Sequence, residues 1–210
     1  MTLVESCCES MADVLLSERA GANRIELCAD LASGGQTPEA DLIREACSVF
    51  SGPVMVLVRP RSGGFVYTPD EIELTVRQIR ESLAAGAFGV VVGCMDARGR
   101  VDRAQLKILV QAADGEPVTF HKAFDEAADH EEAYLDCADL GVARVLTSGG
   151  RKTALQGADV LARLQTMQGP TVLVGGGVRA DHVEDLLRRT GARELHARAS
   201  AIPALMAELG

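Results

Sequence analysis

The segments LVESC (residues 3–7) and RIELC (residues 24–28) decide the fold, because each is a short apolar run carrying polar or reactive side chains at alternate positions. Six similar runs follow, and the eight begin 21 to 35 residues apart: 3–7, 24–28, 54–59, 89–93, 118–121, 144–148, 171–175 and 194–196. This period is typical of a (β/α)₈ barrel, whose catalytic groups lie at the C-terminal ends of the strands.

The segments between these runs are predicted to be helices. Helical spacing predicts helices at residues 10–20, 72–85, 129–140, 157–168, 179–190 and 202–209. Two further helices are predicted to begin at Pro38 and after Asp102, and Thr68 is the predicted N-cap of the helix at 72–85. Four of them end at a glycine before the next strand, namely Gly21, Gly86, Gly141 and Gly191. An open doubly wound sheet would show the same alternation, but its glycine-rich fingerprint after the first strand is missing. We therefore predict an α/β protein with a single, compact TIM-type (β/α)₈ barrel domain over residues 1–210, with short loops.

Composition narrows the classes of partner. The 210 residues include 21 basic and 30 acidic side chains, a net charge of −9, which argues against nucleic acid and anionic membrane surfaces. We expect neither a signal peptide nor a membrane span, because the N-terminus leads directly into a strand containing Glu5. The six cysteines are scattered, so reduced thiols in a cytoplasmic protein are predicted.

Charged side chains gather at the strand ends. Strand alternation puts Glu5 with Cys7 on one face, and Glu26 with Cys28 on the face opposite Ile25 and Leu27, which suit the helix-facing side. Carboxylate, guanidinium and imidazole groups around one mouth suit acid–base chemistry on a small anionic substrate. In this hypothesis Glu5 or Glu26 is the general base and His121 is the general acid. The arginines Arg59 and Arg61 hold the negative charge that develops on the substrate. The alternative is a buried salt-bridge network that closes the barrel.

Glycine clusters follow two later strands and form a candidate anion or phosphate site. Backbone N–H groups at a helix start bind anions, and glycine allows close approach. The candidate residues follow the sixth and seventh runs: Ser148, Gly149, Gly150, Gly175, Gly176 and Gly177. Tight turns are the alternative reading of these glycines.

Two cysteines lie at the ends of adjacent predicted strands. The sulfurs of Cys7 and Cys28 could approach one another, and two soft thiolates suffice to hold Cu(I). No zinc-type spacing is present. Buried cysteines commonly act as small hydrophobic residues, which is the alternative here.

Six motifs together resemble the CutC family of copper homeostasis proteins. They run in order along nearly the whole chain: VESCCES (4–10), RIELCADLASGGQTP (24–38), VLVRPRSGGFVYT (56–68), VTFHKAFDE (118–126), RVLTSGG (144–150) and GGGVR (175–179). Lys122 stands where the family usually has arginine, and the last strand reads LHARAS in place of a family FHSSA.

The resemblance implies a TIM-type barrel, a cytoplasmic location, a homo-oligomer and a role in copper handling. It places Asp125 and His196 among the strand-end residues of the site and makes Cys7 and Cys28 the matching Cu(I) ligands. The residues themselves, rich in carboxylate, arginine and histidine, also suit an enzyme of the lyase, isomerase or hydrolase type. Both interpretations are kept, with a copper ion or a small anionic metabolite, such as a sugar phosphate or carboxylate, as the partner.

Overall fold

The computed structural model describes residues 2–210 and contains one closed barrel of parallel strands. The strands follow one another around the barrel in chain order, and the last pairs with the first. Their bounds are β1 (Leu3–Cys8), β2 (Arg24–Leu27), β3 (Val54–Leu57), β4 (Gly89–Val92), β5 (Val118–Phe120), β6 (Arg144–Thr147), β7 (Thr171–Val174) and β8 (Glu194–Arg198). The predicted (β/α)₈ class is confirmed, and each strand lies where a run was predicted.

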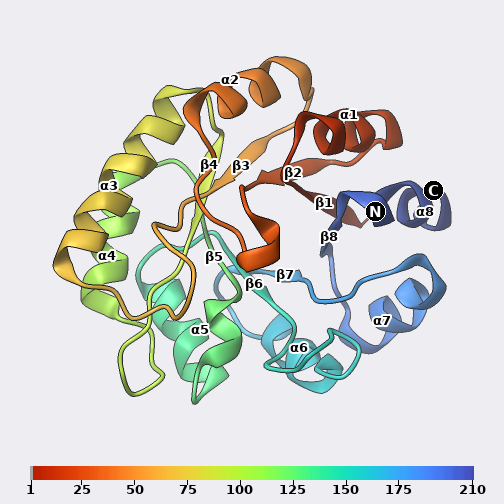
Figure 1. The fold of residues 1–210 in the computed structure, drawn as a ribbon. Coiled ribbons are helices and arrows are strands. Elements are labelled where there is room, and N and C mark those ends of the chain that lie inside the picture. Colours follow the sequence, from red (N-terminus) through yellow and green to blue (C-terminus); the bar gives the residue numbers. More distant parts are fainter. Residues whose placement is uncertain (1) are drawn as a thin grey trace.

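A helix follows each strand and packs outside the barrel (Figure 1). The helices are α1 (Met11–Ala20), α2 (Ala40–Val49), α3 (Pro69–Ala84), α4 (Arg103–Ala112), α5 (His130–Asp139), α6 (Ala158–Gln165), α7 (Val183–Thr190) and α8 (Ile202–Leu209). Short 3₁₀ segments cover Leu31–Ser33, Lys122–Glu126, Ala180–His182 and Ala199–Ala201. The first and last helices lie side by side, near the two chain ends.

Local sequence signals explain most helix boundaries. Thr68 forms a capping box with Glu71 at the start of α3, and Pro69 occupies the first turn. Gly21 ends α1 in the left-handed conformation, with φ of 80°, which glycine adopts at little cost. Helix α2 begins at Ala40 rather than at Pro38, because Glu39 is still extended and serves as its N-cap.

The apolar core has two layers, separated by the strands. The larger lies between strands and helices and includes Val4 and Ile25. A smaller cluster inside the barrel contains Cys7, Cys28, Met55, Leu57 and Val91. Alternation along the strands produces this division, so the polar residues that share a face with Cys7 also point into the barrel.

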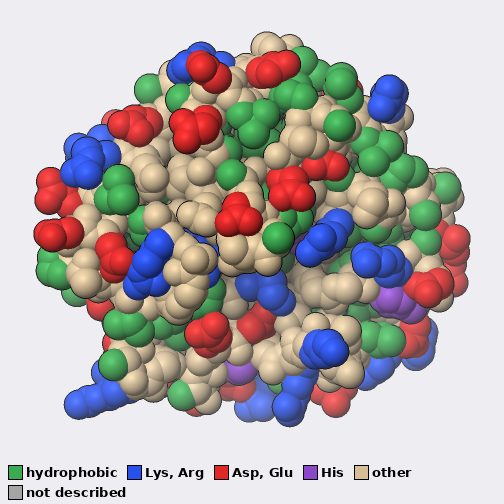
Figure 2. Space-filling model, viewed as in Figure 1, with side chains coloured by type: hydrophobic (Ala, Val, Ile, Leu, Met, Phe, Trp, Pro, Cys, Tyr) green, Lys and Arg blue, Asp and Glu red, His purple; other side chains and the backbone are tan. Residues whose placement is uncertain are grey.

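The outer surface carries charges of both signs. Acidic and basic side chains are interspersed over the face shown in Figure 2. None of the helices within residues 2–210 is both long and apolar enough to cross a membrane.

Candidate functional site

Strand register brings three charged residues together inside the barrel. Glu5 on β1 is level with Arg24 on β2 and, across the closure of the barrel, with His196 on β8. Arg24 donates from Nε to Glu5 and from Nη2 to Glu194, the latter at 2.6 Å. His196 Nδ1 lies 2.8 Å from Glu5 Oε1. We call Arg24, Glu5 and His196 the paired cluster.

The paired cluster holds its carboxylate ionised. Burial alone would raise the pKa of Glu5, but the His196 hydrogen bond and the Arg24 charge lower it to about 2. An ionised carboxylate only accepts hydrogen bonds, so His196 Nδ1 must donate, and its Nε2 is the ring nitrogen left for another partner. Burial opposes protonation of His196, yet hydrogen bonds with Cys7 and Glu5 hold its pKa well above the usual value. Glu5 is thus a fixed negative charge that orients His196.

Arg24 is a charged residue of the candidate site that the sequence analysis missed. Arg59 and Arg61 were predicted to be the arginines of the site, but the arginine that pairs with Glu5 is Arg24. A signal was present, since Arg24 lies two residues before Glu26 and therefore shares its face of β2. Pairing of Arg24 with Glu5 also depends on the register of β1 on β2, which the alternation within a single strand does not indicate.

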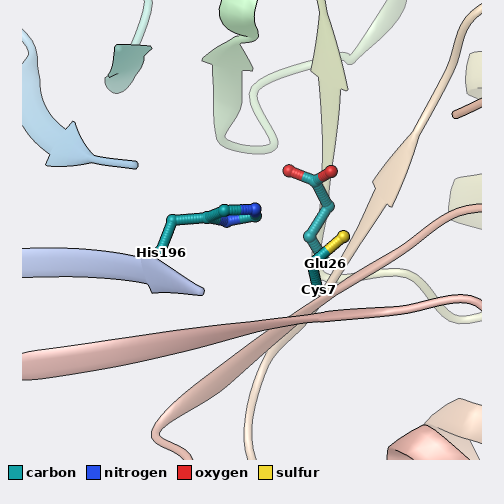
Figure 3. Close-up of side chains that lie close together, drawn as sticks. All are labelled: Cys7, Glu26 and His196. Carbon is teal, nitrogen blue, oxygen red and sulfur yellow. The ribbon is translucent and has the colours of Figure 1, made fainter. Parts of the chain in front are cut away.

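The two predicted thiols meet beside the paired cluster. Cys7 Sγ and Cys28 Sγ are 4.0 Å apart, and both side chains are buried. Cys7, Glu26 and His196 each present a potential ligand atom, and these atoms lie within 4.8 Å of one another. Figure 3 shows the His196 ring, carried by β8, pointing toward Cys7 and Glu26. Thiol, imidazole and carboxyl groups therefore converge on one point that could hold a metal ion.

Burial controls the protonation of this convergent group. The hydrogen bond with Cys28, together with burial, raises the pKa of the Cys7 thiol well above its usual value. Burial also raises the pKa of Glu26 to about 7; His196 opposes this shift and Glu5 adds to it. Glu26 Oε2 is buried without a hydrogen-bond partner among residues 2–210. Glu26 can therefore exchange a proton near neutral pH, which Glu5 cannot.

Arg59 follows strand β3 and lies in a cradle of glycine carbonyls. Its Nη1 donates to the carbonyls of Gly34 and Gly35, each at 3.1 Å, and its Nη2 donates to Gly63. Gly34 has φ of 95°, and a Cβ there would lie 3.0 Å from Arg59 Nη1, so this turn requires glycine. The Arg59 guanidinium also lies 4.8 Å from the centre of the Phe65 ring.

His121 lies next to Phe65, with the two ring centres 4.9 Å apart. Its Nδ1 accepts a hydrogen bond from the Ala123 N–H at 3.1 Å. Burial, followed by the charge of Arg59, lowers the pKa of His121 to about 3, so its ring is neutral. Since Nδ1 is the acceptor, the proton is on Nε2, which has no partner in the described chain. Arg59, His121 and Glu26 line one cavity, and each has a buried polar atom without a partner among residues 2–210. We call these three residues the unpaired cluster; within it, Glu26 lies on the side of Cys7 and His196.

A small cavity of about 120 Å³ opens between the two clusters. Its walls include Cys7, Glu26, Arg59, His121 and His196 from the sites above, together with Leu31, Gly34, Leu57, Phe65, Lys122 and Leu146. Five of the predicted site residues therefore share one cavity. Two more lie directly behind them, since Cys28 contacts Cys7 and Glu5 contacts His196.

Arg61 does not join this group. It pairs with Glu71, and its guanidinium lies 5.0 Å from the centre of the Tyr67 ring. Strand β3 ends at Leu57, so strand alternation does not fix the direction of the Arg61 side chain, which was predicted to hold charge at the site.

Asp125 occupies the first predicted anion loop. It accepts hydrogen bonds from the N–H groups of Ser148 and Gly150, at 3.0 and 2.9 Å, and from the Thr147 hydroxyl. Lys122 Nζ lies 2.9 Å from the same carboxylate. Gly149 donates to the Thr147 hydroxyl, so this loop is bonded within the protein.

The second glycine loop, Gly175–Gly177, lies beside the mouth. A Cβ on Gly175 would lie 3.4 Å from the His196 Cβ, and one on Gly176 would lie 3.6 Å from Lys122 Nζ. The Gly175 N–H donates to the Thr147 carbonyl at 3.0 Å. Gly176 and Gly177 have φ of 106° and 70°. Binding of an anion by these glycines stays a prediction.

Fold and site together define a (β/α)₈-barrel protein with a thiol, imidazole and carboxyl cluster at the strand ends. The model of the CutC family matches residues 2–201. A CutC family protein of Agrobacterium fabrum is 42% identical over 203 residues, covering 96% of this chain and 80% of the relative. One from Salmonella typhimurium is 39% identical, covering 96% and 82%. The chain belongs to the CutC family.

Solved structures agree with the fold. A CutC protein from Streptococcus agalactiae, whose name refers to copper homeostasis, superposes with a TM-score of 0.88 at 29% identity. The match covers 93% of this chain and 98% of that protein. A phosphoribosylanthranilate isomerase from Pyrococcus furiosus has a TM-score of 0.62 at 13% identity, covering 99% and 98%, and shares the barrel fold.

Proposed function

We propose that this protein serves copper homeostasis by binding Cu(I) at the barrel mouth through Cys7 and Cys28, with His196 as a third ligand. The observation that carries this proposal is the thiol pair, 4.0 Å between sulfurs, beside an imidazole whose other nitrogen is fixed by a buried carboxylate. Soft thiolate and imidazole donors suit copper, and membership of the CutC family supports the same ion.

The sulfur spacing fits a shared ion. A metal–thiolate bond is about 2.3 Å long in zinc sites, so two sulfurs on opposite sides of one ion would be about 4.6 Å apart. A separation of 4.0 Å is slightly shorter than two such bonds placed end to end. An ion bound to both thiolates would therefore sit off the line between the sulfurs. His196 is the candidate third donor because its ring lies near Cys7.

His196 has the support expected of a metal ligand. Metal-binding histidines usually donate their second ring N–H to a carboxylate, which fixes the ring and makes it more basic. Glu5 is that carboxylate, at 2.8 Å, and Arg24 in turn holds Glu5. Cu(I) binding requires loss of the protons on Cys7 and His196, both with raised pKa values.

Anaerobic competition titration against a Cu(I)-specific chelator tests the copper proposal. We expect the double variant Cys7→Ser, Cys28→Ser to lose chelator-competitive binding. Cys47→Ser, on the outer helix α2, is the matched thiol control and should bind like the wild type. Equal affinity of the double variant and the wild type would contradict the proposal.

A cytoplasmic location and a homo-oligomeric state are also proposed. All six cysteines are unpaired in the described structure, which suits a reducing compartment. The oligomer rests on the family resemblance alone. Fractionation of cells expressing the tagged protein tests the location, and light scattering of the purified protein tests the oligomer, which a monomeric mass would contradict.

A second function, acid–base catalysis on a small anionic metabolite, is supported by a separate observation. Glu26 has a pKa raised to about 7 and faces the same cavity as Arg59 and His121. A buried carboxyl with a pKa near the working pH suits a general base. Glu5 does not suit this role, because its pKa of about 2 keeps it ionised and weakly basic.

A metabolite screen followed by kinetics tests this second function. We expect Glu26→Gln to fold nearly as well as wild type and to lower any turnover by about 100-fold or more. Glu39→Gln, an exposed carboxylate just before α2, is the matched control. Undiminished turnover in Glu26→Gln would contradict the role of Glu26 as base.

A further inference from the structure

Arg59 is a buried cation without an acidic partner among residues 2–210. Arg59 is 5% exposed, and its two Nη groups donate to backbone carbonyls. Its Nε has no acceptor in hydrogen-bond geometry, and the neutral hydroxyl of Tyr67 lies beside the guanidinium. The two other basic groups in the cavity wall are compensated, Lys122 by Asp125 and His196 by Glu5. A buried charge without a counter-ion is costly, so the position of Arg59 favours an anion in the cavity.

The hydrogen-bonding groups that lack partners line the same cavity. His121 Nε2 and Arg59 Nε are buried N–H donors without acceptors in the described chain. Buried donors are nearly always bonded, and unsatisfied ones call for a missing ligand or water. The tautomer of His121 is set by the Ala123 N–H, so Nε2 offers a hydrogen and cannot accept one. The two donors together match an oxyanion.

Size and wall chemistry narrow the class of anion. A cavity of about 120 Å³ is smaller than the roughly 300 Å³ at which drug-sized sites begin, so it suits a small ligand. Besides its polar and charged groups, the cavity wall has four apolar side chains, Leu31, Leu57, Phe65 and Leu146. A short carbon chain would contact these side chains favourably, whereas a fully hydrated inorganic anion would not.

We infer that the cavity binds a small monocarboxylate of roughly pyruvate size, with its carboxylate held by Arg59 and His121 and its carbon chain against the leucines and Phe65. The inference deepens the second proposed function, because it names the ligand class for that cavity. It does not depend on copper. Glu26 lies in the wall of the same cavity as the bound carbon chain, where a base would act.

Calorimetric titration of the copper-free protein tests the inference, with pyruvate as the probe. His121→Asn keeps an acceptor for the Ala123 N–H but removes the Nε2 donor, and should weaken pyruvate binding about tenfold. His121→Gln restores a donor near the Nε2 position and should recover most of the affinity. Arg59→Gln should abolish binding. Arg77→Gln, on the exposed face of α3, is the control and should bind normally.

Uncharged acetone and inorganic phosphate are the comparison probes. We expect acetone not to bind and phosphate to bind more weakly than pyruvate. Acetone binding as strongly as pyruvate, phosphate binding more tightly, or unchanged affinity in both His121→Asn and Arg59→Gln would overturn the inference. Pyruvate binding without turnover in any metabolite screen would support the site while removing the second function. Cu(I) binding without pyruvate binding would overturn this inference alone.

Discussion

The two clusters at the barrel mouth are built from the same residue types but differ in how their charges are satisfied. In the paired cluster, Arg24, Glu5 and His196 are bonded to one another. In the unpaired cluster, Arg59 bonds to carbonyls, and His121 Nε2 and Glu26 Oε2 have no partner in the described chain. Satisfied groups hold a fixed geometry, as a metal ligand requires, whereas unsatisfied groups are available to a ligand.

The difference extends to protonation. Glu5 and Glu26 lie on neighbouring strands and are 1% and 5% exposed, but their pKa values are about 2 and about 7. Burial acts on both in the same direction, so the contrast comes from the bonds that Arg24 and His196 make to Glu5. Neighbouring cations, rather than depth, decide which carboxyl is charged.

The largest expected effect is on stability. Arg24→Met would leave Glu5 buried with His196 as its one remaining partner, and should lower the free energy of unfolding by about 3–5 kcal/mol. Arg59→Met should cost clearly less, because it leaves no carboxylate buried without a cation. Urea unfolding of the two variants measures the difference. Equal losses would contradict the division into two clusters.

The pH dependence of stability separates the two carboxyls. The folded pKa of Glu5 lies below its reference of 4.5, so its contribution is present above pH 4.5 and is lost as pH falls toward 2. Glu26 has the opposite sign: its contribution is present below pH 4.5 and is lost as pH rises through about 7. Glu26→Gln should therefore gain stability relative to wild type as the pH rises from 4.5 to 8.

Urea unfolding of the wild type and Glu26→Gln across this pH range measures that gain. Glu116→Gln, at an exposed loop position, is the control and should show no such relative gain. A constant difference between wild type and Glu26→Gln at all pH values would show that Glu26 is not perturbed by its surroundings.

A smaller effect is expected on copper affinity. Glu5→Gln keeps the shape of the side chain but weakens the orientation of His196, and should lower Cu(I) affinity about 10- to 100-fold. The competition titration described above measures it. An affinity within twofold of the wild type would mean that His196 takes no part in the site. Glu39→Gln, an exposed carboxylate just before α2, is the control for loss of a carboxylate.

Much of this arrangement was predictable from strand ends and alternation. The apolar runs located all eight strands, and the shared faces of Glu5 with Cys7 and of Glu26 with Cys28 put these groups inside the barrel. The 4.0 Å approach of the two sulfurs follows from their places at the ends of neighbouring strands. These features depend on local periodicity, which one sequence contains.

The remaining features depend on contacts between segments far apart in the chain. The pairing of Arg24 with Glu5 requires the register of β1 on β2, and the His196 bond requires closure of the barrel. Arg61 was misplaced because alternation ends with β3 at Leu57. Asp125 binds the loop after β6, a contact between two loops that no spacing in the sequence indicates.

A crystal structure of the Cu(I)-loaded protein grown with pyruvate tests the central claim most directly. Anomalous scattering at the copper edge should place one ion at Cys7, Cys28 and His196, within the reach of the paired cluster. The pyruvate carboxylate should lie against Arg59 and His121, in the unpaired cluster. Copper away from both cysteines, or pyruvate bound to His196 in place of the metal, would contradict the division of labour between the two clusters.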